Sequence, residues 1–198
     1  MGRVFLLPGM GADARMYGSD YDELNPVRCT WPIGAFADLQ AVAHEMIQRY
    51  QIRSGDWLIG SSMGGMVAQE MADLIPNCPV ILLGSGIHAS ELRRYLFWLK
   101  PLARPPVLGF FQKILWPVGL FGRMLYTSDT TFLTQMCHAC LEWQGAKSGH
   151  VLRLHGKMDI MIRATSPHKR LWGGHLIALS RSKRCVAAIQ ACMAQSPS

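Results

Sequence analysis

The chain has 198 residues, of which 49% are hydrophobic and 17% are charged, a composition typical of one globular domain with a sizeable core. This composition, together with the lack of internal repeats and low-complexity tracts, excludes disordered, collagen-like and repeat proteins. The formal net charge is +7. The basic residues nevertheless do not follow the pattern of a nucleic-acid-binding module, so we expect no nucleic-acid partner.

The first third of the chain alternates strands with helices. Residues 3–7 form an apolar run that stops at Pro8-Gly9, which predicts a buried strand followed by a glycine-rich loop. Such a loop can turn backbone N–H groups toward a site where negative charge develops. Similar apolar runs and helical periodicity predict strands at residues 27–31, 56–59 and 79–83, and helices at residues 39–50 and after Met63. This order is typical of a parallel sheet covered by helices.

The pattern G-x-S-x-G lies between the strand at residues 56–59 and the helix that follows it. The pattern describes a sharp strand-to-helix turn that exposes a serine as a nucleophile, and the residues next to that serine must be small. Ser62 has glycine two residues before it and two residues after it, whereas Ser61 would need Ile59 to be small. We therefore interpret Ser62 as a nucleophile. The alternative is that these glycines only end a strand and open a helix.

Residues 88–145 break the alternation, which divides the chain into a core of residues 1–87 and 146–198 and an inserted helical cap. We expect a helix over residues 91–100 with Ser90 as its N-cap, then proline-broken apolar pieces, then a helix over residues 128–143. The insertion is unusually aromatic, so we interpret it as a lid; a bundle that only fills the core is the alternative. The candidate substrate contacts within it are Phe97, Trp98, Phe110 and Phe111.

After the insertion the sheet resumes. A predicted strand at residues 149–154 leads to Asp159, and a short strand at residues 170–172 leads to Gly173-Gly174-His175 and a last helix over residues 176–193. Ser62, Asp159 and His175 thus each follow the end of a predicted strand. Parallel strands end at the same edge of a sheet, so we expect these three side chains to meet there.

The chain resembles the α/β-hydrolase superfamily over nearly its whole length, through LLPGMGAD, GSSMGG, LHGKMD and GGH. The resemblance implies a reduced, mostly parallel sheet of about six strands flanked by helices. It also implies that Ser62 is the nucleophile, His175 the general base and Asp159 the acid that orients the imidazole. The backbone N–H groups of Met10 and Met63 would form the oxyanion hole. The sequence departs from the family in two ways. Many relatives carry histidine before the first glycine of the loop, where this chain has Pro8. The chain also lacks the usual first strands.

The resemblance implies a serine hydrolase that cleaves carboxylic esters of apolar acyl groups through an acyl-enzyme. An acyl thioesterase is the close alternative, because the basic insertion could hold an anionic group. A non-catalytic ligand-binding protein with the same fold is the alternative of a different class. Ser62 disfavours dehalogenases, which use an aspartate nucleophile. We consider Glu91 next after Asp159 for the acid, and we interpret His155 as part of the turn that leads to Asp159.

We expect no cofactor and no metal, because Cys137 and Cys140 have C-x-x-C spacing but no second pair completes a zinc site. The six cysteines lack a framework spacing and the N-terminus lacks an export signal, which predicts reduced thiols and a cytoplasmic location. Prolines and cations break the apolar region at residues 92–125, so we expect no stable membrane insertion. The expected partner is a small-molecule ester or thioester, and no feature indicates the oligomeric state.

Overall fold

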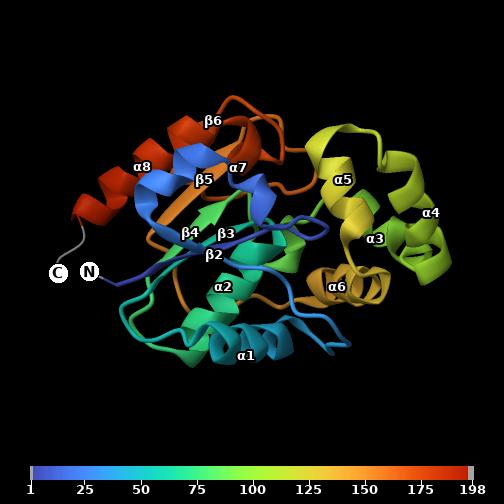
Figure 1. Cartoon of the computed structure of the whole chain (residues 1–198), viewed down its shortest axis with the longest axis horizontal. Helices are drawn as coiled ribbons and strands as arrows, with labels where there is room; N and C mark the ends of the chain where they lie inside the picture. The colour runs from blue at the N-terminus through green and yellow to red at the C-terminus, as the bar shows by residue number, and fades with distance from the viewer. Residues whose placement is uncertain (1, 196–198) are drawn as a thin grey trace.

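The computed structural model describes residues 2–195. Its centre is a sheet of six strands in which all neighbours are parallel, in the order β2-β1-β3-β4-β5-β6 (Figure 1). This confirms the predicted α/β fold with a reduced parallel sheet flanked by helices. The strands are β1 (Val4–Leu7), β2 (Pro26–Arg28), β3 (Trp57–Ser61), β4 (Val80–Leu83), β5 (Leu152–Gly156) and β6 (Lys169–Leu171).

Both faces of the sheet are covered, which explains why its central strands are continuous apolar runs. On one face, Phe5 and Leu7 of β1 pack with the helices α1 (Leu39–Tyr50) and α2 (Met63–Leu74). On the other face, Val4 and Leu6 pack with the 3₁₀ turn at Ser19–Leu24 and the C-terminal helices. Strand residues alternate between two apolar clusters in this way because successive side chains point to opposite sides.

Local sequence sets the helix ends. The carboxylate of Asp38 accepts a hydrogen bond from the Ala41 N–H at 2.8 Å and begins α1, and Gln51 ends it in the left-handed conformation. Asp129 caps α6 (Thr130–Glu142) in the same way, at 2.7 Å from the Phe132 nitrogen. Helix α6 therefore begins two residues later than predicted.

Two predicted helices are broken in the structure. In place of the helix predicted over residues 91–100, the chain forms a 3₁₀ turn (Ala89–Glu91) and then the shorter helix α3 (Arg94–Leu99). The Glu91 side chain is buried, so Glu91 cannot continue a surface helix. The prediction of Ser90 as N-cap was wrong: the His88 ring accepts the Ser90 N–H instead, at 3.0 Å. The C-terminal helix divides at Arg181 into α7 (Ile177–Ser180) and α8 (Ser182–Gln195), where the Arg181 side chain donates to the Trp172 carbonyl.

Strand β5 also runs further than predicted, to Gly156. Gly156 pairs with Leu171 of β6, and it lies so close to Gly174 that a Cβ would come within 2.1 Å of that carbonyl oxygen. Only glycine can occupy such a position. As a result, His155 lies in the strand and not in the turn that follows it.

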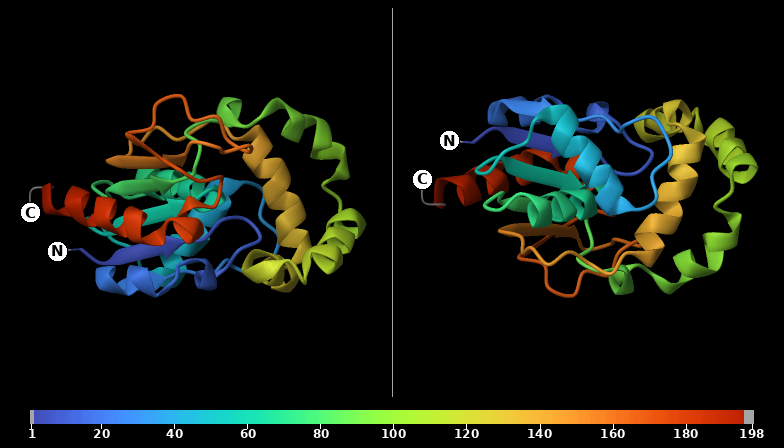
Figure 2. Two further views of the ribbon diagram at one scale, coloured as in Figure 1. Left: turned by 90° about the horizontal axis from the view of Figure 1, so that it is seen from above. Right: turned by 90° about the horizontal axis from the view of Figure 1, so that it is seen from below.

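The helices between β4 and β5 lie beyond the end of the sheet, opposite the chain termini (Figure 2). They are α3, α4 (Pro105–Leu115), α5 (Gly119–Thr127) and α6. Helix α6 packs Phe132 and Met136 into the core, whereas α3 buries no residue and α4 buries only Gln112. None of the helices in residues 2–195 has both the length and the apolar content needed to cross a bilayer.

Candidate active site

Ser62 occupies the sharp turn between β3 and α2. Its backbone has φ 53° and ψ −123°, a conformation that costs energy for a residue with a side chain and that clusters at functional sites. The turn is possible because its neighbours are glycines. A Cβ on Gly64 would lie 2.3 Å from the Pro8 carbonyl oxygen, and a Cβ on Gly60 would lie 2.3 Å from the Gly64 backbone. The glycines thus let the turn pack directly against the loop that follows β1.

The two adjacent serines have different surroundings. The Ser61 side chain belongs to β3, is fully buried, and its hydroxyl has no hydrogen-bond partner among the described residues. The Ser62 hydroxyl lies 2.8 Å from Nε2 of His175. Of the two, only Ser62 can pass its proton to a base.

His175 reaches Ser62 from the loop after β6. Its Nδ1 lies 2.9 Å from Oδ2 of Asp159, so the imidazole bridges the hydroxyl and the carboxylate. The structure therefore brings together the three side chains that the sequence placed after separate strands. Because Oδ2 can only accept a hydrogen bond, Nδ1 carries the proton and Nε2 is free to accept the Ser62 proton.

The carboxylate of Asp159 is held on both oxygens. Oδ1 accepts the N–H groups of Met161 at 2.8 Å and Ile162 at 3.0 Å, while Oδ2 faces His175. Burial by itself raises the pKa of this carboxyl, but hydrogen bonds from His155, His175 and the Ile162 N–H outweigh it and hold the pKa well below its ordinary value. Asp159 is thus an anion that orients the imidazole without accepting its proton.

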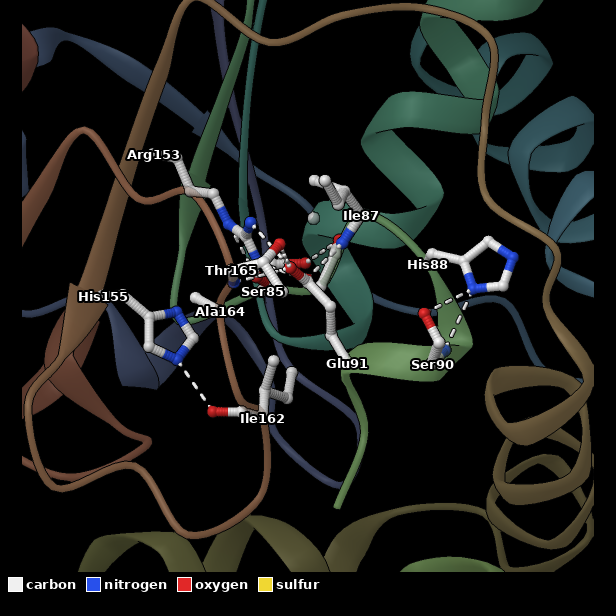
Figure 3. Close-up of polar contacts among 12 residues, drawn as sticks. Ser85, Ile87, His88, Ser90, Glu91, Arg153, His155, Ile162, Ala164 and Thr165 are labelled. Atoms are coloured by element: carbon white, nitrogen blue, oxygen red, sulfur yellow. Dashed lines mark hydrogen bonds and ion pairs between the residues drawn. The ribbon is translucent and has the colours of Figure 1, made fainter. Parts of the chain in front are cut away.

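A second imidazole contacts the same carboxylate. His155 is buried in β5, and its Nε2 lies 2.9 Å from Oδ2 of Asp159. The same Nε2 lies 3.1 Å from the Ile162 carbonyl oxygen (Figure 3). Both neighbours are acceptors, so Nε2 carries the proton. The sequence interpretation of His155 as a turn residue missed this contact. A histidine four residues before the acid was the available signal, but its side chain could be placed only once β5 was known to reach Gly156.

The loop after β1 lies against the serine. A Cβ on Gly9 would come within 3.5 Å of the Ser62 Cβ, and Met10 lines both cavities that reach Ser62. Met63 is the first residue of α2, so its N–H has no acceptor within the helix and lies at the positive end of the helix dipole. The loop that contains Met10 and the first turn of α2 thus both lie beside Ser62, and an oxyanion hole formed by the Met10 and Met63 N–H groups stays a prediction.

A buried ion pair lies beneath the turn. The Arg153 guanidinium donates both to the Glu91 carboxylate and, at 2.9 Å, to the Ser85 carbonyl (Figure 3). The Ser85 hydroxyl donates to the Ser62 carbonyl at 2.7 Å. Glu91 also accepts both the N–H and the hydroxyl of Thr165. Glu91 is thus engaged away from His175, so it supports the backbone of the site and does not orient the imidazole.

The pKa of Glu91 reflects this engagement. Burial raises it, but the hydrogen bonds from Arg153 and Thr165 and from the Ile87 N–H lower it more, to about 2 from an ordinary 4.5. The carboxylate therefore stabilises the fold fully above about pH 4.5 and loses that contribution as the pH falls toward about 2.

We expect Glu91→Gln to lower the free energy of unfolding at neutral pH by about 3–5 kcal/mol, because it leaves the Arg153 charge buried and unpaired. Stability should also depend less on pH between about 4.5 and 2 than in the wild type. Urea unfolding at stepwise lower pH measures both effects. Glu142→Gln is the control: it breaks an exposed pair with Lys100 and should change little. Parallel pH profiles for wild type and Glu91→Gln would contradict this role.

Two apolar cavities meet at Ser62. The larger, of about 300 Å³, is lined by aliphatic, methionine, phenylalanine and cysteine side chains apart from Ser62, His175 and Lys100. The smaller, of about 190 Å³, extends toward Phe121 and Leu125. Of the four candidate aromatics, Phe111 lines the larger cavity, while Phe97, Trp98 and Phe110 are exposed and line neither. The sequence analysis missed the leucines and Met161 that also line the larger cavity.

The cysteines Cys137 and Cys140 take no part in the hydrogen bonds that link Ser62, His175 and Asp159. Cys137 lines the larger cavity, but burial raises the pKa of its thiol to about 11, so it is protonated and a poor nucleophile. Cys140 is buried beside it. Within residues 2–195, no group of three or more histidine, cysteine or acidic side chains is arranged to hold a metal ion.

A family model described as "Alpha/beta hydrolase family" matches residues 3–188. No curated protein sequence matches the chain. Solved structures with the same fold include an esterase from Thermogutta terrifontis, with TM-score 0.72, 16% identity, and coverage of 98% of this chain and 90% of that one. An esterase from Exiguobacterium antarcticum has the same fold, with TM-score 0.72, 18% identity, and coverage of 96% of this chain and 91% of that one. An enol-lactonase from Burkholderia xenovorans LB400 also has this fold, with TM-score 0.76, 14% identity, and coverage of 98% of this chain and 92% of that one.

Proposed function

The chain belongs to the alpha/beta hydrolase family, and on that premise we propose that it is a serine hydrolase that cleaves carboxylic esters of apolar acyl groups. One observation carries the proposal. The Ser62 hydroxyl lies 2.8 Å from Nε2 of His175, whose Nδ1 lies 2.9 Å from the Asp159 carboxylate, at the meeting point of two apolar cavities. Two of the structures with the same fold are described as esterases and one as an enol-lactonase, so ester-bond hydrolysis agrees with their chemistry.

In the first half of the reaction, Ser62 Oγ attacks the ester carbonyl carbon while its proton passes to Nε2 of His175. The carbonyl oxygen becomes an anion, and the Met10 and Met63 N–H groups donate to it. The C–O bond to the alcohol then breaks, and the proton on Nε2 goes to the leaving oxygen. Asp159 stabilises the imidazolium during both transfers. Ser62 is left as an acyl ester.

In the second half, water enters, loses a proton to His175 and attacks the acyl carbon. The carboxylic acid leaves and Ser62 regains its proton. The two cavities provide the two places that this chemistry needs, one for the acyl group and one for the alcohol. We assign the acyl group to the larger cavity, to which α3, α4 and α6 of the cap contribute lining residues, while α5 contributes Phe121 and Leu125 to the smaller one.

The first test is covalent labelling by a fluorophosphonate probe, which reacts only with an activated serine. Wild type should be labelled, and Ser62→Ala should not. An unlabelled wild type that binds apolar ligands would instead indicate a binding protein with the hydrolase fold. p-Nitrophenyl esters and acyl-CoAs with matched acyl chains then separate an esterase from a thioesterase.

We expect kcat/KM to rise about fourfold for each methylene over the first several acyl carbons, because each one leaves water for an apolar wall at about 0.8 kcal/mol. Activity should then fall as the cavity of about 300 Å³ fills. A p-nitrophenyl ester series measures the slope. Phe111→Ser should flatten it, since Phe111 lines the cavity, whereas the matched control Phe110→Ser should preserve it. If wild type and both variants hydrolyse acetyl esters as fast as octanoyl esters, the cavity does not bind the acyl group.

A further inference from the structure

The cap exposes an unusual set of apolar side chains. Among the described residues, ten large apolar side chains are at least half exposed, and six of the ten lie between residues 98 and 118. These six define what we call the outer cap face: Trp98, Leu102, Phe110, Ile114, Trp116 and Val118. Trp98 is 76% exposed and Val118 is 61% exposed, so burial in the fold does not account for their presence. Large apolar side chains gathered in one segment and exposed to this extent mark a surface that contacts something else.

The charge of this segment is one-sided. Residues 92–128 contain six Lys or Arg residues and no Asp or Glu. Lys100 pairs with Glu142. The other exposed cations of α3–α5 form no ion pair with any carboxylate in the described part of the chain: Arg94, Arg104, Lys113 and Arg123. Cations and aromatic side chains on one short helical segment are the combination that favours an anionic lipid surface.

The order of residues in α4 places both kinds of side chain together. Phe110 and Ile114 are four residues apart and Phe110 and Lys113 are three apart, so they share one side of the helix. Trp116 follows α4 and its ring stacks edge-on with Tyr126 of α5, at 6.1 Å between centroids. Tryptophan and tyrosine prefer the boundary between lipid tails and water, because one part of each ring system is apolar and another is polar.

Charge also decides between a lipid surface and a second copy of this chain. Two copies meeting through the outer cap face would bring two sets of unpaired cations together, which opposes association. An anionic bilayer surface is complementary in both charge and apolarity. The contact that we consider is one at the membrane surface, made by exposed side chains of the cap.

The face is continuous with the cavity that reaches Ser62. Leu99, Leu102 and Phe111 are each roughly half exposed to solvent, and each also lines the larger cavity. An acyl chain leaving a lipid layer would therefore move along apolar side chains all the way to the serine. We propose that the outer cap face binds the surface of anionic lipid membranes and loads apolar esters from them; the loading, but not the binding, rests on the proposed function.

The test uses the full chain carrying Ser62→Ala, so that vesicles are not altered by hydrolysis. Co-sedimentation with vesicles of phosphatidylcholine, with and without phosphatidylglycerol, measures the partition coefficient at physiological salt. We expect binding to the anionic vesicles and little binding to phosphatidylcholine alone. Arg104→Ala with Lys113→Ala should lower the coefficient about fivefold for each cation. Trp98→Ala and Trp116→Ala should each lower it by about tenfold, through lost apolar burial.

Matched controls lie outside the cap, directly after β6 and in the first turn of α8. Trp172→Ala removes a tryptophan that is 58% exposed, close to the 53% of Trp116, and Lys183→Ala with Arg184→Ala removes two exposed cations from α8; neither change should affect vesicle binding. Each variant with Ser62 restored is checked for fluorophosphonate labelling, which reports the fold and tests the proposed function separately. No binding to anionic vesicles, or equal losses in the control variants, overturns the proposal. A dimer that dissociates in Trp98→Ala and Trp116→Ala, without vesicle binding, also overturns it and assigns the face to a second copy.

Discussion

Ser62→Ala is expected to lower kcat by something on the order of 10⁶-fold, which is the loss when a serine-hydrolase nucleophile is removed. The reason is geometric: Ser62 Oγ is the only oxygen of the two adjacent serines within reach of His175 Nε2, at 2.8 Å. Without it, no acyl-enzyme forms, and only the slow attack of water remains. Steady-state turnover of a p-nitrophenyl ester measures the change, with active-site titration to exclude wild-type contamination.

The fold should survive this substitution, because alanine keeps the turn small and Ser62 makes its structural contacts through its backbone. The carbonyl of Ser62 accepts the Ser85 hydroxyl at 2.7 Å, and its N–H donates to Leu83 at 3.2 Å. Ser61→Ala is the matched control, since it deletes a buried hydroxyl that has no partner among the described residues. Loss of activity in Ser61→Ala, or a tenth of wild-type turnover in Ser62→Ala, would show that the wrong serine has been chosen.

The sequence predicted the sheet and the three side chains at its edge because those features have short-range signals. β1, β4 and the first three residues of β3 are apolar without interruption, and each run is followed within a few residues by glycine, so strand and turn can be located locally. Parallel strands then bring the loops to one edge without further information. The position of His175 relative to Asp159 follows from the same rule.

Other features of the site depend on packing that no local pattern describes. Glu91 and Arg153 are 62 residues apart, and their pairing is what breaks the predicted helix at residues 91–100. The contact of His155 with Asp159 required β5 to extend to Gly156. The aromatic content of the cap was visible in the sequence, but the direction of each ring was not. Short helices between prolines are apolar on several sides, so periodicity could not separate Phe111, in the cavity, from Phe110, in solvent.

Asp159→Asn is expected to lower kcat by about 10⁴-fold while preserving the fold, through the wrong imidazole tautomer. The surroundings decide how the new amide lies. Oδ1 of Asp159 accepts two backbone N–H groups, from Met161 and Ile162, so the asparagine must keep its oxygen there. Its NH₂ then takes the place of Oδ2 and donates to Nδ1 of His175. The proton of the neutral imidazole moves to Nε2, where it faces Ser62 and blocks proton acceptance.

The same amide also faces Nε2 of His155, which carries a proton and donates to Oδ2 in the wild type. Two N–H groups would meet there, so we expect the His155 ring to give up this contact and keep only the Ile162 carbonyl. Circular dichroism should show a native fold, and the rate of fluorophosphonate labelling should fall with kcat, because both report the base. Glu91→Gln is the matched carboxylate-to-amide control: it should lower stability and leave labelling of the folded protein largely intact. The role of the acid would pass to Glu91 if Asp159→Asn keeps nearly wild-type turnover and Glu91→Gln loses turnover under conditions where it is folded.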